Sequence, residues 1–298
     1  MIYIRKNEVN YPFSRGILSR SIASTGLSLE ESYEVVLKIK NKLEKKNKDV
    51  FELDELKKLI SKELLKRGYQ QAERYYRVRS NLKYLQKPIM IIIGGGTGVG
   101  KSTISAELAH RFGISRIIGT DFIREIMRYM LPKNLVPTLH TSSFLAGEKL
   151  KNKNLEDSLV FGFIEQTNIV LEGFKAVINR STKEGLNLIL NGIHILPGQF
   201  EASLKNKCYL FRYILDIPNT EEHQSRFYPR SEESNRQLNH YLGNLKKIRR
   251  IQDYITQLAD EHNVPVIENQ SFDDTLDTIS DDIIKKLEKV IEKNDKKQ

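Results

Sequence analysis

The residues from Gly95 to Ser102 have the types and the spacing that hold a chain of phosphates. They read GGTGVGKS and match the pattern G-x-x-x-x-G-K-[ST], between an apolar run and an amphipathic helical pattern. Glycines allow backbone N–H groups to approach phosphate oxygens, and the start of the following helix adds the positive end of its dipole. The pattern predicts a nucleotide-binding loop with ligands among Gly95, Gly96, Thr97, Gly98, Val99, Gly100, Lys101, Ser102 and Thr103, of which Val99 could instead be a packing residue.

Two side chains of this loop can take part in phosphoryl transfer. Lys101 offers a positive charge to the β- and γ-phosphates of ATP, and the Ser102 hydroxyl offers an oxygen ligand to Mg²⁺ or another divalent cation. GTPases and motor ATPases usually add a Walker-B aspartate at the end of an apolar strand. Here the run LNLILN ends in Asn191, and Asp216 follows a later strand. We therefore expect ATP to be the co-substrate of a small-molecule kinase in which Lys101 is catalytic.

Asp121 lies in the segment RIIGTDFIREIMR, directly after a second strand-like run. Ligands gather at the carboxyl edge of open parallel sheets, where a carboxylate can orient an acceptor hydroxyl and take its proton. The alternative is a helix cap, which aspartate also forms well. Arg124 and Arg128 are four residues apart and so share one helix face, where guanidinium groups suit a carboxylate or a phosphate. For these arginines, the alternative is a solvated helix face.

A hydroxyl-rich segment, PTLHTSSF from residue 137 to 144, has the composition of a loop that reaches over a site. We expect His140, Ser142 and Ser143 to be candidate substrate ligands, although a structural role for His140 is the alternative. His194, in NGIHILPG, follows the third strand and is a further candidate for a substrate contact. No spacing of histidines and carboxylates predicts a metal site of protein ligands alone.

A polar segment after the fourth strand, HQSRFYPRSEESNR, contains Arg226, Arg230 and Arg236. In kinases with this order of elements, a mobile lid at this place brings arginines onto the phosphates and excludes water. Arg226 and Arg230 are therefore predicted catalytic residues, with a charged surface helix as the alternative.

The order of strand-like and helix-like patterns predicts an α/β fold. Short apolar runs at 88–93, 116–119, 186–191, 208–216 and 264–267 alternate with helical patterns at 101–112, 155–182, 233–261 and 272–293. This alternation is typical of a parallel sheet of five strands that is flanked by helices, as in P-loop kinases. Before Pro88, helical patterns at 28–46 and 52–67 predict a small, mostly helical domain. We expect domains at 1–87 and 88–298.

The net charge of +10 could indicate a nucleic-acid-binding protein, but its distribution argues against one. Residues 1–87 hold 20 lysines and arginines against 11 acids, which leaves 28 against 27 for the rest of the chain. Acids alternate with the lysines at helical spacing, as on a solvated helix face. No apolar run is long enough to span a membrane, and a single cysteine fits a reducing compartment. We expect a cytoplasmic protein that binds neither nucleic acid nor membrane.

At the residues described above, the sequence resembles the archaeal 2-phosphoglycerate kinases. The matching segments are IIIGGGTGVGKSTISAELAHRFGI, RIIGTDFIREIMR, PTLHTSSFLAG, NGIHILPGQF and YLGNLKKIRRIQDYI, in this order from about residue 89 to residue 260. The run YPFSRGILSRSI, in the first domain, is similar to the ATP-cone regulatory domain of that family. One position departs from the pattern, because Asn191 stands where an acidic residue is expected.

The resemblance implies ATP-dependent phosphorylation of the 3-hydroxyl of 2-phosphoglycerate to 2,3-diphosphoglycerate, in the biosynthesis of the thermoprotectant cyclic 2,3-diphosphoglycerate. It also implies that the first domain is regulatory and could bind a nucleotide. Asp121 could take over the role of the missing acid at Asn191. Two alternatives are a kinase of another small anionic metabolite, such as a sugar or polyol phosphate, and a nucleotide-dependent regulator that binds nucleic acid. The sequence does not determine the oligomeric state.

Overall fold

A computed structural model describes residues 1–46, 48–150, 157–199, 204, 206–228 and 238–295. The chain divides into two compact units. The first unit comprises Met1–Leu85, His110–Gly113 and Asp281–Gln298, and the second comprises Gln86–Ala109 and Ile114–Ser280. The predicted boundary after residue 87 lies close to the break at Leu85, although the first unit also includes the C-terminal end of the chain.

The first unit begins with a hairpin whose turn residues have the conformation that such turns need. Strands β1 (Tyr3–Lys6) and β2 (Val9–Pro12) pair antiparallel, and both residues between them, Asn7 and Glu8, have positive φ. Strand β3 (Val50–Glu52), which the sequence did not reveal, pairs parallel with β1. The hairpin thus becomes part of a small three-stranded sheet.

Helices supply most of the first unit and its core. They are α1 (Arg15–Ala23), α2 (Leu29–Glu44), α3 (Leu53–Lys66), α4 (Gln70–Asn81) and the short η1 (Leu82–Tyr84). Ser28 and Glu31 form a reciprocal capping box that fixes the start of α2. The buried side chains of α2 and α3, such as Ile39 and Ile60, recur at helical spacing and form one apolar core.

Helix α13 (Phe272–Asp295) ends in the first unit, where charged groups attach it to α4. Arg74 and Arg77 each donate to the carboxylate of Glu288, both at 2.7 Å. The Tyr75 hydroxyl donates to Asp281 at 3.0 Å. A fragment that ends near residue 87 would lack these partners.

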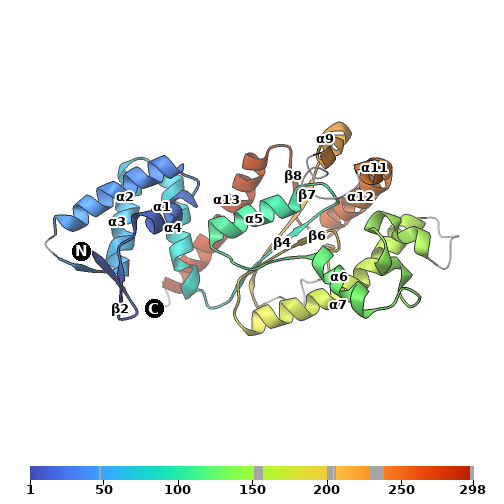
Figure 1. The fold of residues 1–298 in the computed structure, drawn as a ribbon, viewed down its shortest axis with the longest axis horizontal. Coiled ribbons are helices and arrows are strands. Elements are labelled where there is room, and N and C mark those ends of the chain that lie inside the picture. The colour runs from blue at the N-terminus through green and yellow to red at the C-terminus, as the bar shows by residue number, and fades with distance from the viewer. Residues whose placement is uncertain (47, 151–156, 200–203, 205, 229–237, 296–298) are drawn as a thin grey trace. The chain divides into compact units, whose positions relative to one another are not determined.

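The second unit contains five parallel strands in the order β5-β6-β4-β7-β8 (Figure 1). They are β4 (Ile89–Gly94), β5 (Ile117–Gly119), β6 (Leu188–Gly192), β7 (Tyr209–Asp216) and β8 (Val266–Glu268). Strand β4 is fully buried at the centre, as a continuous apolar run in a covered sheet requires. The predicted five-stranded parallel fold is confirmed.

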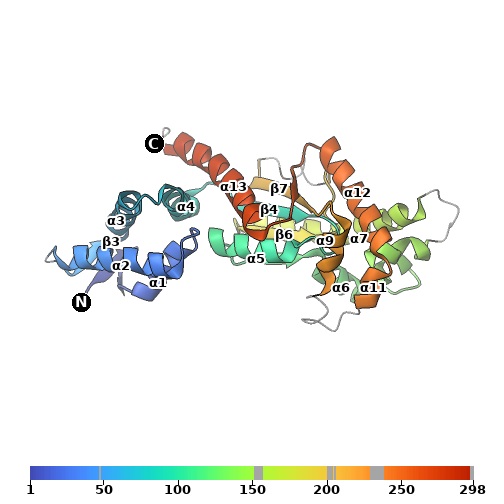
Figure 2. The ribbon, with the colours of Figure 1, turned by 90° about the horizontal axis from the view of Figure 1, so that it is seen from above.

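Helices cover this sheet (Figures 1 and 2). They are α5 (Lys101–Phe112), α6 (Thr120–Met130), α7 (Ser158–Lys183), α9 (Thr220–Ser225), α11 (Leu238–Leu242), α12 (Leu245–Glu261) and the start of α13, with short turns η2 (Pro137–His140) and η3 (Ser143–Lys149). Met90 and Ile92 of β4 pack against α7 residues such as Phe174, so one sheet face is closed by that helix. None of the helices described here is both long enough and apolar enough to cross a bilayer.

The predicted single helix at 233–261 is wrong in its middle. The structure breaks it at Gly243 and Asn244, so that α11 ends at Leu242 and α12 begins at Leu245. Glycine is unfavourable in a helix interior, which is consistent with the break at this position. Residues 233–237 lie outside the described part of the chain.

Candidate active site

The glycine-rich loop joins the buried end of β4 to the first residue of α5. Gly98 has a φ of +92°, and a Cβ there would lie 2.6 Å from the ring of Phe227, so both backbone conformation and space require glycine. The Lys101 ammonium donates to the Gly96 carbonyl at 2.5 Å across the loop. The side chain that is predicted to meet the phosphates is therefore held over the loop.

Three buried side chains from distant parts of the chain hold the outer side of this loop. Gln252 of α12 accepts a hydrogen bond from the Gly96 N–H. His223 of α9 donates from Nε2 to the Thr97 carbonyl at 2.8 Å, and Asn269, after β8, donates to the Val99 carbonyl at 2.9 Å. Each bond satisfies a backbone polar group of the loop and so restricts the movement of the loop.

The rings and amides of this set are held in one orientation. Burial lowers the pKa of His223, and Nδ1 of that ring accepts from Arg249 at 3.5 Å, which leaves the Nε2 proton for the loop. Gln252 also donates to the Leu215 carbonyl at 3.2 Å and to Thr256 at 3.1 Å, which fixes its amide. The sequence analysis did not identify these three residues, because polar side chains in helices, such as Gln252 and His223, and in loops, such as Asn269, resemble surface positions.

Replacing Gln252 with alanine is expected to raise the KM for ATP about tenfold with a smaller change in kcat, since a buried hydrogen bond is worth about 1–3 kcal/mol and 1.4 kcal/mol is a factor of ten. Steady-state kinetics with varied ATP measure the effect. Gln257→Ala is the matched control, because Gln257 lies on the same helix, is exposed and bonds only Glu261 among the interactions described for its side chain. An unchanged KM for ATP in Gln252→Ala would contradict the bracing role.

A cavity of about 460 Å³ opens in front of the loop. It brings together residues of the loop, of the start of α6, of the hydroxyl-rich segment and of the end of β6. Its lining includes Thr97, Lys101, Ser102, Asp121, Arg124, Ser142, Ser143 and Asn191. Seven of the sixteen lining residues were proposed as site residues from the sequence, and they come from segments that are far apart along the chain.

Asp121 lies in the first turn of α6, and its side chain is 62% exposed toward the cavity side of the helix. Gly119, not Asp121, occupies the N-cap position, so capping does not account for the carboxylate. Arg124 Nη2 is 3.8 Å from Asp121 Oδ1, and Nη1 donates to the Thr141 carbonyl at 3.5 Å. The Nε of Arg124 is buried and has no hydrogen-bond partner within the described part of the chain. A buried donor of this kind needs an acceptor, and an anionic ligand would supply one.

Arg128 and His140 are not among the residues that line this cavity. Arg128 pairs with Glu125 at 2.8 Å on the same helix, and His140 donates from Nε2 to the Leu131 carbonyl at 2.7 Å. Their predicted contacts with substrate stay predictions, because in this structure both side chains have protein partners instead.

His194 lies behind the cavity wall and is 1% exposed. Burial lowers its pKa to about 3, helped by the positive charges of Arg124 and Lys101, so the ring is neutral. Nε2 donates to Gln166 Oε1 at 2.8 Å, and Nδ1 therefore accepts from the Thr120 hydroxyl at 3.0 Å. The predicted direct contact with substrate stays a prediction. The observed bonds instead fix Thr120, the first residue of α6.

Comparison with known proteins identifies both parts of the chain. The ATP cone domain matches residues 1–84. A 2-phosphoglycerate kinase from Pyrococcus horikoshii is 40% identical over 280 residues, which are 94% of this chain and 92% of that protein. A 2-phosphoglycerate kinase from Methanopyrus kandleri is 39% identical, covering 96% and 88% of the two chains. The chain belongs to the 2-phosphoglycerate kinase family. A solved gluconokinase from Sinorhizobium meliloti 1021 aligns with a TM-score of 0.42 and 13% identity, covering 70% of this chain and 99% of that one.

In this member of the 2-phosphoglycerate kinase family, Asn191 is the penultimate residue of β6, the strand next to the one that precedes the loop. Strand β6 pairs Asn191 with Ile93 of β4 and with Gly119 of β5, and the Asn191 side chain lines the cavity. An amide thus stands where the resemblance led us to expect an acid. Among the described residues, no group of three or more histidines, cysteines, aspartates and glutamates could hold a metal ion.

Arg226, one of the two predicted lid arginines of this family member, ends helix α9 beside the loop-bracing residues. Its guanidinium donates to Glu222 at 2.9 Å and to the carbonyls of Asn269 and Gln270 at 3.1 and 3.0 Å. Asn269 in turn donates to the glycine-rich loop, so Arg226 is one residue removed from that loop. Arg230 lies outside the described residues.

Proposed function

We propose that this chain transfers the γ-phosphoryl group of ATP to the 3-hydroxyl of 2-phosphoglycerate, giving 2,3-diphosphoglycerate. The observation that carries the proposal is the cavity in which Lys101 and Ser102 of the glycine-rich loop face Asp121 and Arg124 of α6. The near full-length similarity to 2-phosphoglycerate kinases supports the acceptor. A product of this kind would serve the biosynthesis of cyclic 2,3-diphosphoglycerate.

The two sides of the cavity would hold the two reactants. The loop N–H groups and Lys101 bind the β- and γ-phosphates, while the dipole of α5 adds to their attraction. Asp121 accepts the proton of the acceptor hydroxyl as that oxygen attacks the γ-phosphorus, and the bond to the β-phosphate oxygen breaks to release ADP. The charge of Lys101 stabilises the oxygens that gain charge during transfer.

The acceptor carries a phosphate and a carboxylate, and cavity groups suit both. Arg124 offers its buried Nε, which has no hydrogen-bond partner in the described chain, to one anionic group. The hydroxyls of Ser142 and Ser143 lie on the same cavity wall and can donate to a second one. His194 keeps Ser143 nearby, since its Nε2 lies 3.3 Å from the serine oxygen.

A divalent cation fits the donors of the cavity, which are oxygen atoms. The Ser102 hydroxyl, the Asp121 carboxylate and the Asn191 amide oxygen line the same space, and Mg²⁺ prefers such ligands together with substrate phosphates. When bound, the cation would neutralise charge on the phosphates. We propose that Ser102 holds it directly.

Incubation of the full chain with Mg²⁺, ATP and 2-phosphoglycerate is expected to yield 2,3-diphosphoglycerate and ADP in equal amounts, detected by ³¹P NMR. Glycerate and 3-phosphoglycerate serve as controls, because each lacks the 2-phosphate that Arg124 is proposed to meet. No transfer to 2-phosphoglycerate, together with transfer to a sugar or polyol phosphate, would refute the acceptor and retain the reaction class. Hydrolysis of ATP without any acceptor product would refute both.

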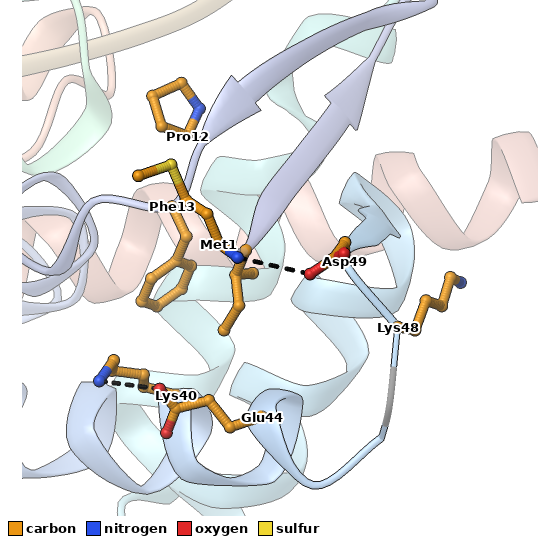
Figure 3. Close-up of a pocket in the computed structure, with 8 residues that line it drawn as sticks. Met1, Pro12, Phe13, Lys40, Glu44, Lys48 and Asp49 are labelled. Carbon is orange, nitrogen blue, oxygen red and sulfur yellow. Dashed lines mark hydrogen bonds and ion pairs between the residues drawn. The ribbon is translucent and has the colours of Figure 1, made fainter.

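We propose that the first unit binds a regulatory nucleotide. A hollow of about 640 Å³ is lined by Met1, Ile2, Pro12, Phe13, Lys40, Glu44, Lys48 and Asp49 (Figure 3). The Lys40 and Lys48 ammonium groups and the chain amino group give it a small positive excess over its two carboxylates. We infer that a nucleotide binds here. Labelling with an azido analogue of ATP would then modify peptides within residues 1–85.

The cytoplasmic location of the protein stays a prediction.

A further inference from the structure

The outer face of helix α6 is apolar and open. Phe122, Ile126, Tyr129 and Met130 are 77%, 61%, 95% and 72% exposed. Their spacing of four, seven and eight residues from Phe122 places them along one side of the helix. A single exposed apolar residue is ordinary, whereas a continuous row on one helix is typical of a surface that binds another molecule.

The inner face of the same helix packs on the core of the second unit, so the residues of the outer row are not needed to complete that core. Ile123 is buried, and Ile123 and Met127 pack into the core that α7 closes. Gly173 of α7 allows this close approach, because a Cβ there would lie 2.6 Å from Ile123. Helix α6 is therefore apolar on two sides, and only one of them is buried within the second unit.

The area of the open face is most of one half of a stable dimer interface. From their exposed fractions, the four side chains present roughly 600 Å² of surface, compared with about 800 Å² that each partner buries in an interface of standard size. A small ligand would leave most of this area in water.

The charges beside the row favour a second copy as the partner. Glu125 and Arg128 flank it, with opposite charge and one helical turn apart. Two α6 helices that cross antiparallel near Ile126 would bring Glu125 of each copy toward Arg128 of the other. A surface that is complementary to itself in this way is what a twofold interface requires.

We propose that two copies of this chain associate through the outer face of α6, around a twofold axis near Ile126. Phe122 and Glu125 also line the active-site cavity, so the interface reaches the rim of that cavity. In the dimer, the second copy covers the exposed ring of Phe122. The proposal rests on surface chemistry alone and stands apart from the choice of acceptor.

Light scattering coupled to gel filtration tests the proposal on the full chain. The wild type is expected to elute with twice the chain mass at about 10 µM, a concentration at which a dimer with a Kd of about 1 µM is mostly formed. Ile126→Glu is expected to elute as a monomer, because each copy would place a charge at the axis. Leu65→Glu is the matched control, since Leu65 is a half-exposed helical leucine of the first unit, and it should remain dimeric.

A disulfide test separates this interface from any other. Cys208 is the single cysteine, and it is buried with its pKa raised to about 11, so an added thiol would react first. Mild oxidation of Ile126→Cys should yield a reducible covalent dimer, and Leu65→Cys should not. A monomeric wild type, or a dimer that survives Ile126→Glu and gives no Ile126→Cys disulfide, would overturn the proposal.

Discussion

Replacing Lys101 with alanine should lower kcat by about 10³-fold, the upper range for loss of one preorganised group that meets developing charge. Lys101 is the cationic residue of the glycine-rich loop that lines the cavity, and the loop N–H groups cannot replace its charge. Because these N–H groups remain, the KM for ATP should change less than kcat. Single-turnover measurements with saturating ATP would isolate the chemical step.

The effect of this variant on catalysis must be distinguished from a general effect of losing a lysine and from a loss of stability. Lys101 donates to Gly96 across the loop, so its loss could also loosen the loop. Lys175→Ala removes an exposed lysine of α7 that pairs with Glu172, and it should leave kcat unchanged. Thermal unfolding of Lys101→Ala should lie close to that of the wild type. Near-normal kcat in Lys101→Ala would show that phosphoryl transfer does not occur at this loop.

Much of this site follows from local patterns in the sequence. Short apolar runs predicted the five strands, and the carboxyl ends of parallel strands meet at one edge, which is why Asp121 and Asn191 could be expected near Ser102. The hydroxyl-rich segment was placed at the site by composition alone, and Ser142 and Ser143 do line the cavity. Local signals sufficed because each of these residues lies next to a strand or loop with a strong pattern.

The residues that hold the site in shape could not be predicted in this way. Gln252 contacts Gly96 across 156 positions of the chain, and no periodicity links two such residues. His194 was expected to contact substrate because it follows a strand, yet its burial depends on how α7 places Gln166 beside it. Strand β3 has only three residues and forms through its pairing with β1, so its own sequence carries little signal.

The exchange of Asp121 for asparagine should lower kcat by about 10²- to 10⁴-fold, the range that a positioned general base contributes. Asparagine keeps the size and the helix position but cannot accept the proton of the acceptor hydroxyl at neutral pH. The phosphates of ATP are held by the loop and by Lys101, so the KM for ATP should stay within about threefold of the wild-type value. This is the result expected when a substitution removes an interaction that forms only in the transition state.

Asp274→Asn is the matched control for Asp121→Asn, because Asp274 is an exposed acid in the first turn of helix α13 and does not line the cavity. The control variant also loses a favourable interaction with a helix dipole, which is worth about 0.3–1 kcal/mol, but Asp274 does not contact the substrate that accepts the phosphoryl group. If both variants lost stability alike and kept full activity, Asp121 would be a helix-stabilising acid only. If Asp121→Asn alone lost turnover, and the deficit shrank as pH rose and solvent hydroxide replaced the missing base, its carboxylate would be the group that takes the proton. Asn191 could not replace it, since an amide does not accept a proton in this pH range.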